Sequence, residues 1–204
     1  MLSAHDLASR RGNARLFRGI SFALAAGEAL VVTGANGTGK TTLLRILGGL
    51  CTPHAGEVRW AGNPDKTFAA GIRAFVTYVG HAPALKDELT AGENLALLTR
   101  LSGEKVAPPA IATALDAVGL ANKAQLPSRF LSQGQRRRIG LARLALSRRP
   151  LWLLDEPATA LDAQGTELLD TLVREHLAGG GVAAIATHLP LGLPETRMRA
   201  LALA

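Results

Sequence analysis

Residues 29–47 read ALVVTGANGTGKTTLLRIL, and this segment carries the strongest indication of the fold class. An apolar strand, Ala29–Val32, leads into the glycine-rich segment Gly34–Thr41, and an apolar helix follows from about Lys40 to Leu47. Glycines let successive backbone N–H groups turn toward phosphate oxygens, and the helix start adds its partial positive charge. A glycine-rich loop that joins a strand to a helix and ends in Lys-Thr predicts a nucleotide site.

The end of this loop carries the polar side chains of the predicted site. Lys40 is expected to reach the β- and γ-phosphates of ATP, and the Thr41 hydroxyl is expected to ligate Mg²⁺. Lys40 is also a candidate catalytic residue, whose replacement by Ala should abolish ATP turnover. The residues expected to bind the nucleotide here are Gly34, Ala35, Asn36, Gly37, Thr38, Gly39, Lys40, Thr41 and Thr42.

A second motif, Leu151–Glu156, reads as an apolar strand that ends in two adjacent carboxylates. The carboxyl end of such a strand faces the crevice in which α/β proteins bind ligands. Neighbouring strand residues point to opposite faces, so the two carboxylates can divide the work. We expect Asp155 to hold Mg²⁺ through water, and Glu156 to orient or deprotonate the attacking water as the catalytic base.

The stretch 131–135, LSQGQ, precedes an apolar-rich helix. Ser132 and Gln135 have the spacing of a capping box, which satisfies the first N–H groups of a helix. A capped helix start beside Gly134 and a hydroxyl is also an anion site. One such helix start suffices for one nucleotide, so the second is expected to serve another ligand or the nucleotide of a second molecule.

The composition limits the remaining possibilities. The 204 residues are 48% hydrophobic and 19% charged, as in a globular domain, and only 4% are aromatic, which disfavours stacking platforms for single-stranded nucleic acid. Cys51 is the single cysteine, which excludes an intrachain disulfide and a multi-cysteine zinc site. The longest apolar runs are too short to span a bilayer, and no signal peptide is expected. The net charge of +7 favours anionic partners.

Strand and helix patterns alternate at both ends of the chain around a helical middle. This arrangement predicts an α/β fold with a parallel-sheet core and a helical subdomain. We expect one domain over residues 1–204, with 1–83 and 148–204 in the core and about 84–147 in the helical subdomain. The predicted strands are Phe17–Leu24, Ala29–Val32, Val58–Trp60, Ala74–Val79, Leu151–Leu154 and Val182–Thr187, and Ala163–Ala178 is a predicted helix.

The motifs, taken in order, resemble the nucleotide-binding subunits of ATP-binding cassette (ABC) transporters. They are the phosphate loop, LSQGQ, LLDE, Ala160-Leu161-Asp162 and Thr187-His188. The resemblance implies a P-loop NTPase domain of ABC type, with an antiparallel β part beside the parallel sheet. It also implies a head-to-tail dimer, in which each ATP lies between the phosphate loop of one copy and the LSQGQ signature of the other.

The same resemblance assigns further residues to the nucleotide site. It implies that Ser132, Gly134 and Gln135 contact the nucleotide of the partner copy, and that Asp162 lies at the dimer seam. It implies that His188 contacts the γ-phosphate and the attacking water, which makes it a candidate catalytic residue beside Glu156.

The match narrows to one branch of the ABC proteins. Trp60, the run Tyr78–Lys86, Leu89-Thr90 and Glu93–Leu95 resemble the CcmA family, the ATP-binding subunits of the bacterial cytochrome c maturation (haem exporter) complex. This resemblance implies an ATPase that couples hydrolysis to haem export or handling. It further implies a peripheral position on the cytoplasmic side of the bacterial inner membrane, bound to integral membrane subunits of CcmB/CcmC type.

Two other functions stay open at this point. One is the ATPase subunit of an ABC exporter for another substrate. The other is a soluble ABC protein that acts on ribosomes or nucleic acid, although such proteins usually carry a second cassette, a coiled-coil insertion or a zinc insertion. No nucleic-acid partner is expected.

Three positions depart from the general ABC pattern. His81 stands where a Gln usually meets Mg²⁺ and the membrane subunit, and we expect it either to keep that role with added pH sensitivity or to be an ordinary exposed histidine. Arg11 replaces the aromatic residue that stacks on adenine, and its guanidinium is expected either to stack or to face solvent. Gln133 replaces a common Gly. The charges of Arg136–Arg138 are expected to attract the partner's triphosphate or to form a solvated face.

Overall fold

The computed structural model of the chain describes residues 2–61, 63–65 and 74–204. The chain folds into two compact units. The first, called the sheet unit here, comprises Met1–Tyr78, Arg149–Glu156 and Val173–Ala204, and the second, the helical unit, comprises Val79–Arg148 and Pro157–Leu172.

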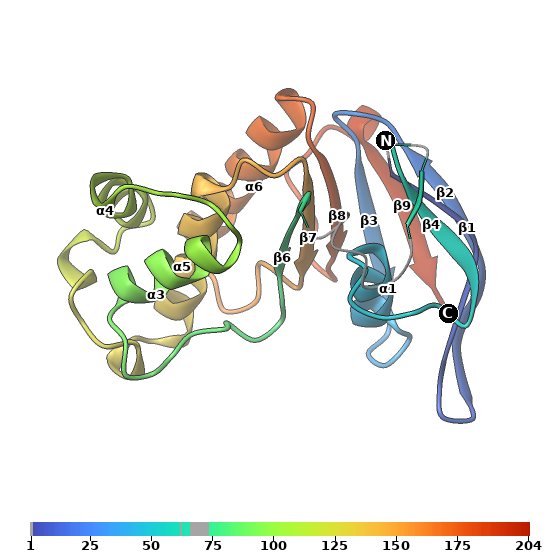
Figure 1. The fold of residues 1–204 in the computed structure, drawn as a ribbon, viewed down its shortest axis with the longest axis horizontal. Coiled ribbons are helices and arrows are strands. Elements are labelled where there is room, and N and C mark those ends of the chain that lie inside the picture. Colours follow the sequence, from blue (N-terminus) through green and yellow to red (C-terminus); the bar gives the residue numbers. More distant parts are fainter. Residues whose placement is uncertain (1, 62, 66–73) are drawn as a thin grey trace. The chain divides into compact units, whose positions relative to one another are not determined.

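Two sheets build the sheet unit (Figure 1). The antiparallel sheet has the strand order β2-β1-β4-β5, and the other sheet has the order β6-β7-β8-β3-β9, in which β7, β8, β3 and β9 pair in parallel. The strands are β1 (Leu2–Arg11), β2 (Ala14–Leu24), β3 (Ala29–Gly34), β4 (Ala55–Trp60), β5 (Asn63–Asp65), β6 (Val76–Val79), β7 (Leu151–Asp155), β8 (Val182–Ala186) and β9 (Met198–Leu203).

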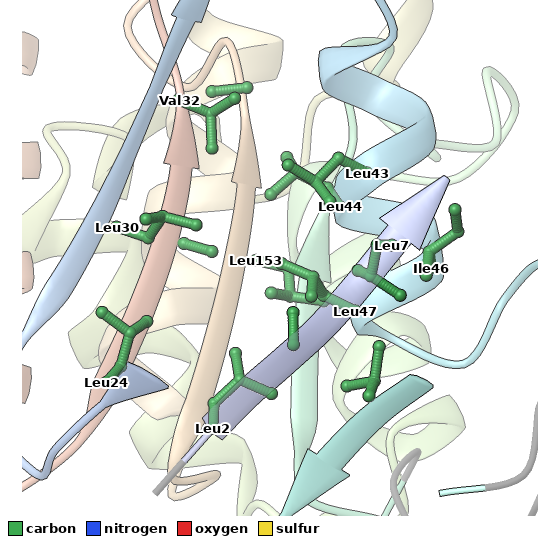
Figure 2. Close-up of a cluster of buried hydrophobic side chains, with 14 of the residues drawn as sticks. Leu2, Leu7, Leu24, Leu30, Val32, Leu43, Leu44, Ile46, Leu47 and Leu153 are labelled. Atoms are coloured by element: carbon green, nitrogen blue, oxygen red, sulfur yellow. The ribbon is translucent and has the colours of Figure 1, made fainter. Parts of the chain in front are cut away.

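The core of this unit lies between one face of the helix α1 (Lys40–Leu47) and strands of both sheets, as Figure 2 shows. The helix buries four aliphatic side chains in one cluster with residues of both sheets, and each is worth about 2 kcal/mol. It ends because Gly49 has a φ of 63° and the N–H of Leu50 turns back to the carbonyl of Arg45. The cluster includes Leu43, Leu44, Ile46 and Leu47 of α1, Leu2 and Leu7 of β1, Val32 of β3 and Leu153 of β7.

Three helices pack against one another in the helical unit: α3 (Ala91–Leu101), α4 (Pro108–Ala117) and α5 (Gln133–Leu146). Two short 3-10 turns, η1 (Ala121–Lys123) and η2 (Ser128–Phe130), join α4 to α5. The helix α6 (Ala163–Ala178) begins in this unit and ends in the sheet unit, where η3 (Glu195–Arg197) also lies. Within the described ranges, no helix has both the length and the apolar character needed to cross a membrane.

Three of the described strands, β1, β5 and β9, were not predicted from the sequence. The strand β1 pairs with β2 through three register shifts, and Asp6 has a φ of 47° between its buried residues. These irregularities break the alternation by which a strand is recognised. The strand β5 has only three residues, and β9 forms the edge of the parallel sheet beside β3. The predicted strand at 74–79 is shorter than expected, because β6 begins at Val76.

Candidate active site

The phosphate loop leaves the sheet at Gly34 and enters α1 at Lys40. Its turns use the left-handed backbone, with φ angles of 89° at Gly37 and 103° at Gly39. A Cβ at Gly39 would lie 3.1 Å from both Leu16 and Phe17 of β2, so this glycine also permits close packing. The predicted strand-loop-helix context is therefore present.

Lys40 lies over its own loop. Its Nζ donates to the carbonyl of Gly34 at 2.7 Å and to that of Ala35 at 3.2 Å, and the residue is only 8% exposed. The ammonium is thus held at the loop next to the start of α1, where the partial charge of the helix is also positive. Positive charge concentrated on a glycine-rich loop suits the phosphates of a nucleotide.

The strand register brings three chain segments to one edge of the parallel sheet. Ala186 of β8 pairs with Asp155 on one side and with Val32 on the other. Because these strands are parallel, the residues that follow each of them emerge at the same edge. The phosphate loop follows Val32, Glu156 follows Asp155, and His188 lies two residues beyond Ala186. The phosphate loop, the Asp155-Glu156 pair and His188 therefore share this edge.

Asp155 is the buried acid of this edge, with 2% exposure. The hydroxyl of Tyr78 lies 3.4 Å from its Oδ2. Burial raises the pKa of Tyr78, the negative charge of Asp155 raises it further, and a hydrogen bond from Arg45 opposes both. Arg45 was not singled out in the sequence, and Tyr78, which lies on a strand beside β7, was named there only as part of the run that resembles the CcmA family.

Two of the three residues predicted to contact Mg²⁺, Thr41 and Asp155, fit that ion by their chemistry. Asp155 supplies a carboxylate and Thr41, at the start of α1, supplies a hydroxyl, which are the hard oxygen donors that Mg²⁺ takes. The described part of the chain holds no cluster of three or more His, Cys, Asp or Glu residues for a metal. A two-residue set agrees with an ion that keeps water and phosphate oxygens as its other ligands.

Glu156 and His188 contact each other. Nδ1 of His188 lies 2.9 Å from Oε2 of Glu156, and the side chains are 64% and 14% exposed respectively. Glu156 lies one residue beyond β7 with a φ of 51°, and its N–H donates to the carbonyl of Ala186. Because Glu156 lies outside the strand, strand alternation does not set the direction of its side chain. The prediction that alternation directs Asp155 and Glu156 to opposite faces is therefore wrong in its reasoning. The left-handed backbone is costly for a non-glycine residue and is typical of functional sites.

The signature segment forms the predicted capping box at the start of α5. The N–H of Gln135 donates to Oγ of Ser132 at 3.2 Å, and the N–H of Ser132 donates to Oε1 of Gln135 at 3.0 Å. A Cβ at Gly134 would lie 2.8 Å from the carbonyl of Ala160, so only a glycine lets this loop approach the helix start. Ser132 is exposed, and Gly134 and Gln135 are half-buried.

The three arginines that follow make intrachain contacts, which corrects the expectation of a solvated face. Arg136 pairs with Asp87, and Arg138 pairs with both carboxylate oxygens of Asp162 at 2.7 and 3.0 Å. Arg137 is 4% exposed and donates to two backbone carbonyls. Acceptors within the helical unit therefore compensate charges that the helix dipole does not favour.

Asp162 caps α6. Its Oδ1 accepts from the N–H of Gly165 at 2.9 Å, and this hydrogen bond, followed by that from Arg138, lowers the pKa of its carboxyl. The Asp162 carboxylate, predicted to lie at a dimer seam, is thus engaged with α5 and α6 of its own chain.

The three positions that depart from the general ABC pattern, His81, Arg11 and Gln133, are all exposed. Arg11 is the last residue of β1 and pairs with Ala14 across the tip of the β1–β2 hairpin. The carbonyl of His81 accepts a hydrogen bond from Arg137.

Comparisons with known proteins confirm the resemblance. The ABC transporter family matches residues 17–159. The cytochrome c biogenesis ATP-binding export protein CcmA of Dechloromonas aromatica is 45% identical over 203 residues, which cover 100% of both chains. CcmA of Aromatoleum aromaticum is 50% identical over 199 residues, covering 96% of this chain and 93% of the relative. CcmA of Pseudomonas aeruginosa is 47% identical over 193 residues, covering 95% of each.

Solved structures confirm the fold. A putative ABC transporter ATP-binding protein of Pyrococcus furiosus superposes with a TM-score of 0.84 at 24% identity, covering 99% of this chain and 96% of that chain. A dimeric ATP-binding cassette in a post-hydrolysis state, bound to ADP and Pi, superposes with a TM-score of 0.79 at 24% identity, covering 93% and 88%. The chain belongs to the ABC transporter family and, within it, to the CcmA group of cytochrome c biogenesis ATP-binding export proteins.

Proposed function

We propose that this chain is the ATP-hydrolysing subunit of an ABC transporter that serves cytochrome c biogenesis, with haem as the transported or handled molecule. Its nucleotide is ATP and its ion is Mg²⁺, in keeping with its family. The observation that carries the ATPase proposal is the Glu156–His188 contact at the sheet edge from which the phosphate loop also emerges. The haem assignment rests on the relatives, which are named for cytochrome c biogenesis and export.

The residues of the sheet unit divide the chemistry as follows. Lys40 and the backbone of Gly34–Thr42 bind the phosphates, while Thr41 and Asp155 hold Mg²⁺, which would neutralise phosphate charge when bound. Glu156 accepts the proton of the attacking water, and His188 holds the Glu156 carboxylate through the 2.9 Å contact and reaches the γ-phosphate.

Two copies of the chain form the complete ATPase in this proposal. The capped start of α5, with Ser132, Gly134 and Gln135, binds the nucleotide held by the phosphate loop of the other copy. Asp162 lies in the loop at the seam between the copies. The capping box at this helix start supports the proposal, because such a start can bind an anion. One nucleotide needs only one such helix start, and the phosphate loop already supplies it. The similar cassette with ADP and Pi is dimeric.

Membrane subunits of CcmB/CcmC type complete the transporter, and the chain is peripheral to the cytoplasmic side of the bacterial inner membrane. His81 couples the ATP site to these subunits and contacts Mg²⁺, so His81→Gln should alter basal activity or its pH profile. Arg11 stacks on adenine, so Arg11→Ala should weaken ATP binding while Arg11→Tyr should preserve it.

The experiment is affinity purification of the Glu156→Gln variant from detergent-solubilised membranes with Mg-ATP, with partners identified by mass spectrometry and haem by absorbance. Recovery of a multi-helix membrane subunit together with haem-handling proteins supports the proposal. Recovery of a different membrane protein without haem supports the transporter ATPase and contradicts the haem assignment. Recovery of ribosomes or DNA overturns the transporter function.

A further inference from the structure

Arg137 is a buried cation on α5, two residues after the LSQGQ signature ends. Its Nη1 donates to the carbonyl of Gly80 at 2.9 Å and to the carbonyl of His81 at 2.8 Å. Both acceptors lie 56 or more residues away in the sequence. The arginine thus joins the start of α5 to the segment that follows β6.

Burying a guanidinium at this position costs free energy, which only its hydrogen-bond acceptors offset. The residue is 4% exposed, so its charge is largely removed from water. It also lies near the amino end of α5, where the partial charge of the helix is positive, and between two other arginines. Two charge-assisted hydrogen bonds offset this cost. An apolar side chain of similar length would fill the space without the cost, but it would leave both carbonyls without these donors.

The two carbonyls that accept from Arg137 lie close in sequence to a residue that contacts the candidate active site. Gly80 follows Tyr78 by two residues, and Tyr78 contacts the buried Asp155. The far end of the same loop is fixed as well, because the Asn94 side chain bonds to both backbone groups of Lys86 and to the carbonyl of Leu89. The loop after β6 is therefore held at both ends by helices of the helical unit.

We infer that Arg137 is a positioning residue for ATP hydrolysis, which fixes the backbone at Gly80 and His81 and thereby orients the His81 side chain. Through this contact the start of the signature helix and the loop that carries His81 keep one arrangement within the helical unit. The inference rests on the proposed function, because it assigns Arg137 an effect on the same ATPase through His81.

A double-mutant cycle tests whether Arg137 acts through His81. Wild type, Arg137→Met, His81→Ala and the double variant are compared as the full chain for kcat, ATP affinity and Tm. We expect Arg137→Met to lower kcat by about 10- to 100-fold, the loss that a misplaced group can cause. We expect ATP affinity to stay within about twofold of wild type, and Arg137→Met to lower kcat by less than about twofold when it is added to His81→Ala. Arg137→Lys, which keeps a donor, should retain more of kcat than Arg137→Met.

Arg143→Met is the matched control, since Arg143 lies on the same helix and donates to Oγ of Ser102 instead. It should leave kcat unchanged, whatever its effect on Tm. Equal losses of kcat from Arg137→Met in the wild-type and His81→Ala backgrounds overturn the inference, as does a normal kcat in Arg137→Met. If Arg137→Met does not fold, the comparison of Arg137→Lys in the two backgrounds decides. A wild-type chain without ATPase activity contradicts the proposed function itself, so the two failures are distinguishable.

Discussion

Nδ1 of His188 lies 2.9 Å from Oε2 of Glu156, although the two residues are 32 positions apart in the chain. The contact arises because each residue follows the end of one of two paired parallel strands, β7 and β8. The bond fixes the direction of a carboxylate whose backbone has already left the strand geometry. A base held in this way needs little reorganisation before it accepts a proton from water.

Glu156→Gln should bind Mg-ATP normally and hydrolyse it about 10²- to 10⁴-fold more slowly, because an amide cannot accept the proton. The bound nucleotide then persists, and the dimer should accumulate. Phosphate release and light scattering after size exclusion, each with saturating Mg-ATP, measure the two effects. Glu175→Gln, an exposed change on α6, is the control. A monomeric Glu156→Gln protein under these conditions would contradict the head-to-tail dimer.

His188→Ala should lower kcat by at least about tenfold and leave ATP affinity nearly unchanged, because it removes the group that orients Glu156. Residues that act as a unit are not additive. The double variant with Glu156→Gln should therefore be little slower than Glu156→Gln alone. His54→Ala removes an exposed histidine outside the site and serves as the control. Multiplicative losses in the double variant would show that the two residues act independently.

The sequence predicts the elements whose signals are local. The bounds of α1 and α6 agree with the prediction, since Gly48-Gly49 stops α1 and the Gly179–Gly181 turn follows α6. The capping box at Ser132 is likewise a four-residue pattern that needs no knowledge of the rest of the chain. The phosphate loop belongs to the same class of signal.

The remainder depends on contacts that are distant in the sequence. The strand β1 escapes prediction because its register shifts interrupt the alternation of buried Leu2, Ala4 and Leu7. The roles of the arginine triplet escape it because Asp87 and the carbonyls of Gly80 and Val118, which accept from these arginines, lie 20 or more residues away. The sequence alone predicts that a run of like charges is electrostatically unfavourable, but only the fold shows which acceptors offset the repulsion.

Gly39→Ala should destabilise the protein more than Gly37→Ala does. Both glycines have a left-handed backbone, with φ angles of 103° and 89°, so each change costs about 1–2 kcal/mol in backbone strain. Only the Cβ at position 39 meets neighbours, at 3.1 Å from Leu16 and Phe17, which adds an overpacking cost of about 1–3 kcal/mol. Urea unfolding of both variants measures the difference. Equal losses of the free energy of unfolding in the two variants would mean that Leu16 and Phe17 of β2 move away from the new Cβ at no energetic cost.

Asn94 should be a large contributor to the stability of the helical unit. It is fully buried, and its Nδ2 donates to the carbonyls of Lys86, Leu89 and Thr90 and to Oγ of Ser128. Asn94→Ala leaves buried acceptors unsatisfied and should cost about 3 kcal/mol or more of the free energy of unfolding. Asn94→Asp should be at least as harmful because it places a carboxylate before these acceptors.

The control for Asn94 is Asn122→Ala, an exposed change in η1 of the same unit, which should cost less than about 0.5 kcal/mol. Chemical unfolding followed by circular dichroism compares the three variants. A loss for Asn94→Ala that equals that of Asn122→Ala would show that water replaces the lost hydrogen bonds.

His176 should make the stability of the sheet unit depend on pH near neutrality. Its ring stacks on that of Trp152 with centroids 3.9 Å apart and an angle of 7°, and its Nε2 lies 3.2 Å from the carbonyl of Val182. Burial lowers the pKa of His176 below its ordinary value of 6.5. Below pH 6.5 the unfolded chain therefore binds a proton that the folded protein does not bind.

The free energy of unfolding should accordingly be highest above about pH 6.5 and fall as the pH drops from there toward the folded pKa of His176, by at most about 1.4 kcal/mol per pH unit. Protonation of carboxyl groups whose pKa is lowered in the folded protein, such as Glu28, reduces the free energy of unfolding only at more acidic pH. His176→Phe keeps a ring against Trp152 and cannot bind the proton, so it should flatten the profile between about pH 5 and pH 7. Urea unfolding across this range, with the exposed His54→Gln as control, measures the slope. An unchanged slope in His176→Phe would assign the pH dependence to another group.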